Sequence, residues 1–102
     1  MAASDGRNRS SKWAVVGAER FLWERFEDGA AVYDVRSGQT HFLTPFAAKA
    51  LELLGQTPLT ESELDEAVCH ALGVQPDSES GNMAEQSVAE FHELGLISRI
   101  AP

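Results

Sequence analysis

The stretch from Gly38 to Leu54 constrains the fold of this chain most, because it encodes a turn, a strand and a helix in immediate succession. Gly38 closes the turn, and residues 39–43 have the β-branched and aromatic composition of a strand. Thr44 and Pro45 then predict a helix start, since threonine caps free amides and proline lacks an N–H that would be unpaired there. The apolar positions of this helix follow at helical spacing: Ala47, Ala50, Leu51 and Leu54. A strand that runs directly into a helix leaves one strand edge beside a groove lined by helices.

Two further strands are predicted before this unit. Residues 20–26 are rich in aromatic side chains, and residues 30–35 form a second strand-like run. Asp28-Gly29 between them is a hairpin turn signal, and residues 36–38 turn the chain into the third strand. Three strands with two short connections predict an antiparallel meander. Neither face of the first strand alternates cleanly between apolar and charged residues, which leaves open the face that meets the helices.

The second half of the chain changes to helical periodicity. Thr60 and Glu63 have the spacing of a capping box, and Gly73 predicts the end of the helix that follows. Its expected buried stripe contains Leu64, Ala67, Val68, Ala71 and Leu72. We expect a polar loop over residues 75–82 and a third helix over about 83–94, ended by Gly95. The apolar side of that third helix contains Val88, Phe91 and Leu94.

The ends of the chain are less regular. Residues 1–12 are small and polar, and we expect a disordered tail there. Residues 13–17 are a short apolar patch, either a strand or a packed segment, and residues 96–100 are either a last strand or a packed tail. Strands followed by helices predict an α+β fold over residues 13–102, with a three-stranded antiparallel sheet followed by three helices. A chain of 102 residues is expected to form one domain.

Charge is distributed unevenly along the chain. The formal net charge is −8, and no lysine or arginine occurs between Lys49 and Arg99. A nucleic-acid-binding protein needs a basic face to neutralise phosphates, so this composition argues against such a partner. The acidic surface either keeps the domain soluble or attracts basic segments of a partner.

The titratable residues form no catalytic or metal-binding pattern. Cys69 is the single cysteine and follows Val68 in a predicted helix, where a buried structural thiol is expected. The histidines His41, His70 and His92 have no metal-ligand spacing, and the glycines are scattered. We therefore expect no enzyme, no metal and no cofactor. No apolar run approaches the roughly 20 residues of a membrane span, so we expect a cytoplasmic protein without membrane contact.

Several segments together resemble the PqqD-like family: Tyr33-Asp34, residues 38–43 (Gly-Gln-Thr-His-Phe-Leu), residues 45–48 (Pro-Phe-Ala-Ala), Leu51, Leu53-Leu54, Thr60, Leu64 and residues 94–97 (Leu-Gly-Leu-Ile). More narrowly, they are similar to the branch described as PqqD-family peptide chaperones found alongside HPr-kinase-related proteins. The resemblance covers roughly residues 13–100. Its most distinctive part is Gly-x-Thr-His-x-Leu leading into Pro-x-Ala-Ala.

The resemblance implies a winged-helix-like RiPP recognition element, which binds the leader of a ribosomally synthesised precursor peptide in natural product biosynthesis. Such a domain delivers the leader to a peptide-modifying enzyme, here one related to HPr kinase. The leader adds as a strand, and its side chains enter a cleft against the third helix. The implied peptide-binding residues are Gln39, Thr40, His41, Phe42 and Leu43 on the strand edge and Ser87, Val88, Phe91 and His92 on the helix. Residues 39–43 contain neither proline nor lysine, which leaves that edge free to pair.

Other functions remain as alternatives to a peptide chaperone. A structural adaptor would dock maturation enzymes without binding a free peptide. A winged-helix transcription regulator has a similar order of elements, but Glu85, Glu90 and Glu93 on the third helix would repel phosphates. An open strand edge also allows a homodimer.

Overall fold

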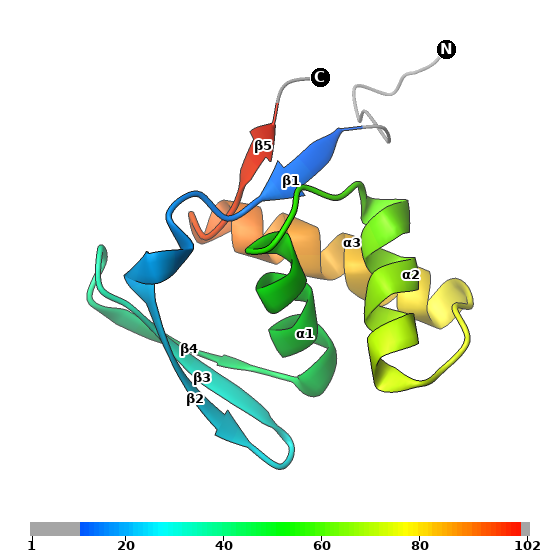
Figure 1. The fold of residues 1–102 in the computed structure, drawn as a ribbon, viewed down its shortest axis with the longest axis horizontal. Helices are drawn as coiled ribbons and strands as arrows, with labels where there is room; N and C mark the ends of the chain where they lie inside the picture. Colours follow the sequence, from blue (N-terminus) through cyan, green and yellow to red (C-terminus); the bar gives the residue numbers. More distant parts are fainter. Residues whose placement is uncertain (1–10, 101–102) are drawn as a thin grey trace.

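A three-stranded sheet, three helices and a small second sheet make up residues 11–100, the part of the chain that the computed structural model describes (Figure 1). The elements are β1 (Lys12–Ala14), a 3₁₀ turn (Ala18–Arg20), β2 (Phe21–Phe26), β3 (Gly29–Asp34), β4 (Gln39–Leu43), α1 (Pro45–Leu54), α2 (Glu61–Leu72), α3 (Ser78–Glu93) and β5 (Ser98–Ile100). The predicted tail over residues 1–12 lies outside the described residues except for Ser11 and Lys12.

The predicted α+β fold is confirmed. The main sheet has the strand order β2-β3-β4 with both pairs antiparallel, and the three helices follow it in the chain. β4, which the sequence predicted as the third strand of the sheet, has the predicted limits. β2 begins at Phe21, because Arg20 still belongs to the preceding 3₁₀ turn. β4 has a neighbour on only one side, so it forms an edge of the sheet.

Capping residues mark the N-terminal ends of the three helices. The Thr44 hydroxyl accepts from the Ala47 amide at 3.2 Å, with Pro45 in the first turn of α1. The capping box of Thr60 and Glu63 is present at the start of α2. The prediction of a polar loop over residues 75–82 is wrong in its second half, because Asp77 and Ser80 form another capping box and α3 begins at Ser78.

The predicted stripe of α2 is correct at its start and wrong at its end. Leu64 and Val68 are buried in the core, whereas Ala71 and Leu72 are exposed. Cys69 is buried beside Val68, as expected for a structural thiol. In the last turn of α2 the core cluster therefore includes Cys69 but neither Ala71 nor Leu72.

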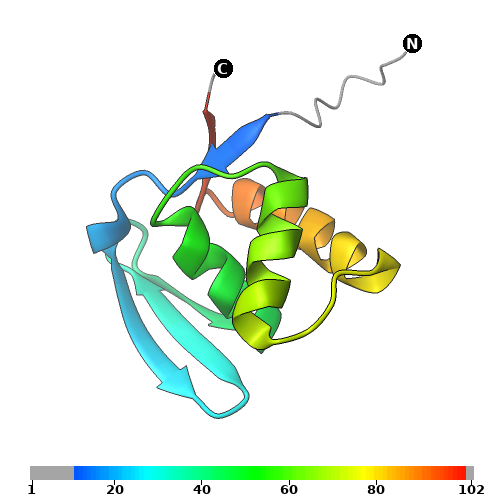
Figure 2. The same ribbon diagram turned by 45° about the vertical axis from the view of Figure 1, so that its right-hand side comes forward.

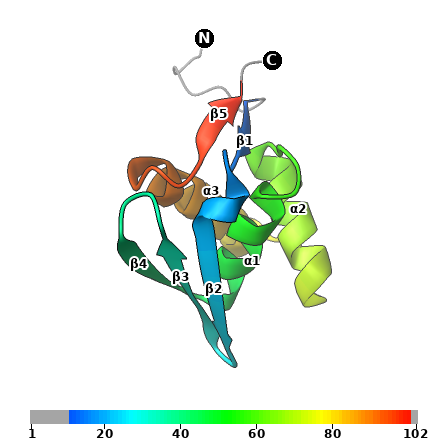
Figure 3. The same ribbon diagram turned by 60° about the vertical axis from the view of Figure 1, so that its left-hand side comes forward.

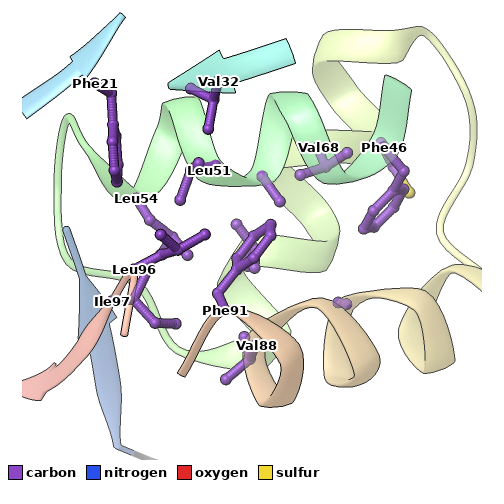
Figure 4. Packing of buried hydrophobic residues seen from close by; sticks show 14 residues of the cluster. Phe21, Val32, Phe46, Leu51, Leu54, Val68, Val88, Phe91, Leu96 and Ile97 are labelled. Atoms are coloured by element: carbon purple, nitrogen blue, oxygen red, sulfur yellow. The ribbon is translucent and has the colours of Figure 1, made fainter. Parts of the chain in front are cut away.

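The core lies between the sheet and the three helices (Figure 4). α1 lies between the sheet and α2, as Figure 2 shows, and α3 passes across the same core. The largest fully buried side chains include Phe91, Leu51 and Leu54. Sheet residues Phe21 and Val32 join this cluster, which identifies the face of the sheet that meets the helices.

A second sheet ties the two ends of the described chain together. β1 pairs antiparallel with β5, and the two strands lie side by side at the end of the described chain opposite the β2–β3 turn, at the top of Figure 3. Trp13 also exchanges backbone hydrogen bonds with Leu59, at 2.8 and 3.0 Å. Both alternatives left open by the sequence are thus resolved in favour of short strands at 12–14 and 98–100.

A buried ion pair joins the main sheet to the loop after α3. Arg20 Nη2 lies 2.7 Å from Asp34 Oδ2, and its Nε donates to Oδ1 at 3.1 Å. The same Nη2 donates to the carbonyl oxygen of Gly95 at 2.8 Å. The hydrogen bond from Arg20, with smaller contributions from Arg36, outweighs burial and lowers the pKa of Asp34 from 3.8 to about 2. We call Arg20, Asp34 and Gly95 the polar junction.

Candidate functional site: a groove beside an open strand edge

A groove of about 640 Å³ lies between β4 and α3. β4 contributes Thr40, His41, Phe42 and Leu43. The first turn of α1 contributes Thr44, Phe46 and Ala47, and the α3 side consists of Met83, Gln86, Ser87, Glu90, Phe91 and Leu94. Most of this lining is apolar, which suits a ligand with apolar side chains.

The open edge of β4 borders this groove. Val35 N donates to Arg20 O at 2.9 Å, which sets the phase of the hydrogen bonds between β2 and β3. Because bonded pairs alternate along antiparallel strands, the even-numbered residues of β3 face β4, and their register partners are Gln39, His41 and Leu43. The backbone N–H and C=O groups of Thr40 and Phe42 are therefore left for an added strand.

The opposite edge of the sheet, β2, is covered by charged groups. The Arg25 guanidinium lies 4.5 Å from the centroid of the Trp23 ring, and its Nη2 is 3.6 Å from Glu52 Oε2 of α1. Charged side chains on an edge strand discourage strand addition. β4 carries no charged side chain, so the edge beside the groove is the one that remains available.

His41 is the polar residue of the groove with an unmet hydrogen-bonding need. Its Nε2 is buried and has no hydrogen-bond partner among the described residues. A buried polar atom without a partner costs roughly 1–3 kcal/mol. A ligand group that hydrogen-bonds to this nitrogen would remove that cost.

Glu90 gives the groove its negative charge. It is the charged residue of the lining, and it lies in the last turn of α3 together with Glu93. The C-terminal end of a helix carries partial negative charge, so carboxylates there are unfavourable until a cation approaches. The groove therefore favours a basic group on its ligand.

The structure brings most of the predicted site residues together. Thr40, His41, Phe42, Leu43, Ser87 and Phe91 line the groove. Gln39 belongs to β4 but not to the groove lining, and its strand partner is Asp34. Val88 and His92 lie on another side of α3, where they line a separate pocket with Trp13. His92 packs its ring against Trp13, with 5.0 Å between ring centroids.

Sequence analysis did not assign the groove residues Met83, Gln86, Glu90 and Leu94. The sequence could have indicated these residues, because they are spaced three or four positions from one another or from Ser87 and Phe91 and so share one helical face. The helix residues that the family resemblance implied include Val88, which is 2% exposed and belongs to the core. Thr44, Phe46 and Ala47 of the α1 start were also missed as groove residues.

The described residues contain no cluster that could hold a metal ion. Within residues 11–100, no group of three or more His, Cys, Asp or Glu side chains converges on a metal position. The pKa of Cys69 is raised: a hydrogen bond with Ser80 lowers it, but burial and the neighbouring Asp65 and Asp77 outweigh that effect. None of the helices in residues 11–100 is long and apolar enough to cross a membrane.

Comparison with known proteins yields one clear fold neighbour. By sequence, neither a protein-family model nor a curated protein matches this chain. Among solved structures, the chain is similar to TbiB1, determined in complex with the TbiA(beta) leader peptide. The TM-score is 0.62 at 12% sequence identity, and the match covers 87% of this chain and 99% of TbiB1. The two proteins thus share a fold.

Proposed function

We propose that this protein is a RiPP recognition element of the PqqD-like kind, a non-catalytic peptide chaperone. It binds the leader of a ribosomally synthesised precursor peptide by strand addition to β4. The observation that carries the proposal is the open β4 edge beside an apolar groove, with Thr40 and Phe42 offering free backbone groups. The fold shared with TbiB1, whose structure contains a leader peptide, supports the same function.

Strand addition explains how one site provides both affinity and selectivity. The backbone of the leader pairs with β4, and alternate side chains enter the groove against α3. The groove exposes Met83 and Leu94 to apolar side chains of the ligand. It also offers His41 Nε2 as a hydrogen-bonding group, and Glu90 attracts a basic residue. A leader rich in apolar residues and carrying lysine or arginine is the expected ligand.

Delivery of the leader to a modifying enzyme, for example an HPr-kinase-related one, requires a second surface. The outer face of the sheet supports this step, because Leu22, Tyr33 and Phe42 are 59%, 40% and 80% exposed. The same face favours the second candidate function, an adaptor that docks enzymes in the cytoplasm without binding a free peptide.

Two matched substitutions at Phe42 test the proposal. Phe42→Pro removes the open-edge N–H and blocks strand addition, whereas Phe42→Thr keeps the N–H and the β propensity. Immobilised wild-type protein is used to capture peptides from a lysate of the native organism, and mass spectrometry identifies them. We expect a precursor peptide whose affinity falls about 100-fold with Phe42→Pro and much less with Phe42→Thr.

Circular dichroism and urea unfolding show whether each variant is folded. Capture of an enzyme alone, unchanged by Phe42→Pro, would favour the adaptor. Tight binding of duplex DNA at low salt would instead favour a transcription regulator.

A further inference from the structure

A second hollow, of about 480 Å³, adjoins the peptide groove where α1 begins, α2 ends and α3 begins. It shares Thr44, Phe46 and Met83 with the groove. No residue of the proposed strand-addition site on β4 lines it, so the proposed function leaves it without a role. We call it the second hollow.

The second hollow exposes apolar side chains that the core does not use. Leu72, Val74 and Met83 are 42%, 55% and 37% exposed, and all three line it. Its inner wall includes Phe46 and Cys69, which are 6% and 0% exposed. Apolar side chains gathered at one concave place on a surface mark a binding site more often than scattered ones do.

The direction of β4 connects the two hollows. β4 passes directly into Thr44 and Pro45, the residues that start α1. A strand paired with all of β4 spans roughly 17 Å at about 3.4 Å per residue, and it leaves the sheet at Leu43. The next residues of that strand then lie over Thr44 and Met83, the shared boundary of the two hollows. A continuous extended peptide therefore reaches the second hollow without a sharp turn.

We propose that the leader peptide bound on β4 continues past the end of the strand and anchors a second apolar side chain in the second hollow, against Leu72 and Val74. This inference rests on the proposed function. It defines the ligand as a peptide with two apolar anchors, one beside α3 and one a few residues beyond the part that pairs with β4.

The test uses a displayed library of random 16-residue peptides as the probe. Binders are selected on the wild-type protein and retained only if Phe42→Pro abolishes their binding. The best binder is synthesised at full length and in two truncated forms, each lacking the residues beyond one end of its β4-paired part. Affinities are then measured for the wild type, Leu72→Gln and Val74→Ser. Val16→Ser, at an exposed apolar position that lines neither hollow, is the matched control.

We expect one of the two truncations to weaken binding about tenfold, as the loss of one buried apolar side chain predicts. Leu72→Gln should weaken binding of the full-length peptide by a similar factor and leave binding of that truncated peptide unaffected, whereas Val16→Ser should change neither affinity. Equal affinity of wild type and Leu72→Gln for every peptide would overturn the inference and leave strand addition intact. Failure to find any binder that depends on Phe42 would overturn the proposed function, and this inference with it. A concentration-dependent dimer lost in Leu72→Gln would assign the second hollow to another copy of the chain instead.

Discussion

The polar junction and the groove beside β4 both lie between the main sheet and the C-terminal part of α3, but they differ in how completely their polar groups are hydrogen-bonded. In the junction, Arg20 and Asp34 are 8% and 1% exposed, and the guanidinium reaches the Gly95 carbonyl. Among the described residues, His41 Nε2 in the groove has no hydrogen-bond partner, and no strand pairs with the outer edge of β4. The junction therefore joins the sheet to the chain just after α3, whereas the groove leaves hydrogen-bonding groups without partners among residues 11–100. Four predictions test whether stability and binding are separated in this way.

The largest expected effect is on stability, from Asp34→Asn. Loss of the carboxylate charge leaves the Arg20 guanidinium buried without an anion, and breaking such a pair costs about 3–5 kcal/mol in the free energy of unfolding. Urea unfolding measures this cost. Asp28→Asn, in the exposed turn between β2 and β3, is the matched control and should change stability by less than about 0.5 kcal/mol. Equal stability of the two variants would show that the Arg20–Asp34 pair does not stabilise the fold.

The second prediction concerns the pH dependence of the same pair. Because the hydrogen bond from Arg20 lowers the pKa of Asp34 from 3.8 to about 2, the carboxylate contributes its full stabilisation above pH 3.8. That contribution, about 2 kcal/mol, is lost as the pH falls from 3.8 through 2. Comparison of urea unfolding at several pH values should show this loss in the wild type and a smaller one in Asp34→Asn. Parallel pH profiles would contradict the assignment.

The third prediction concerns His41, where we expect a substitution to lower peptide affinity without lowering stability. His41→Leu removes the unpartnered nitrogen, so the free energy of unfolding should stay the same or rise by up to about 1 kcal/mol. Affinity for the captured peptide should fall about tenfold, because the ligand loses a hydrogen-bonding partner. His92→Leu is the control outside the groove and should leave peptide affinity unchanged. A stable His41→Leu variant that binds the peptide with full affinity would show that His41 does not contribute to peptide binding.

The smallest expected effect concerns ligand charge. Glu90→Lys should weaken a peptide with lysine or arginine near Glu90 about fivefold, and the difference should shrink as salt is added. Glu66→Lys makes the same charge change on exposed α2 outside the groove. Isothermal titration at two salt concentrations measures both variants. The same loss in both variants would assign the effect to the overall acidity of the protein rather than to the groove.

Local sequence signals predicted the elements on which the groove depends. Each of these signals depends on a few neighbouring residues, so it could be recognised from their types. They are the Thr44-Pro45 start of α1, the Thr60 capping box of α2 and the two ends of β4. The start of α3 was missed because a serine in the third helical position completes the box at Asp77, where Glu or Gln is the usual signal. The end of the α2 stripe was missed because periodicity identifies an apolar face without indicating how far other elements cover it.

The sequence by itself determined the three strands of the main sheet, the three helices and their order, because turns, caps and residue periodicity depend on residues close together in the chain. The tertiary structure decided which groups meet. It joined Arg20 to Gly95 across the whole domain, buried Val88, and turned Glu90 rather than His92 to the groove. These contacts depend on how helices rotate when apolar faces pack against one sheet, and no single stretch of sequence records that rotation.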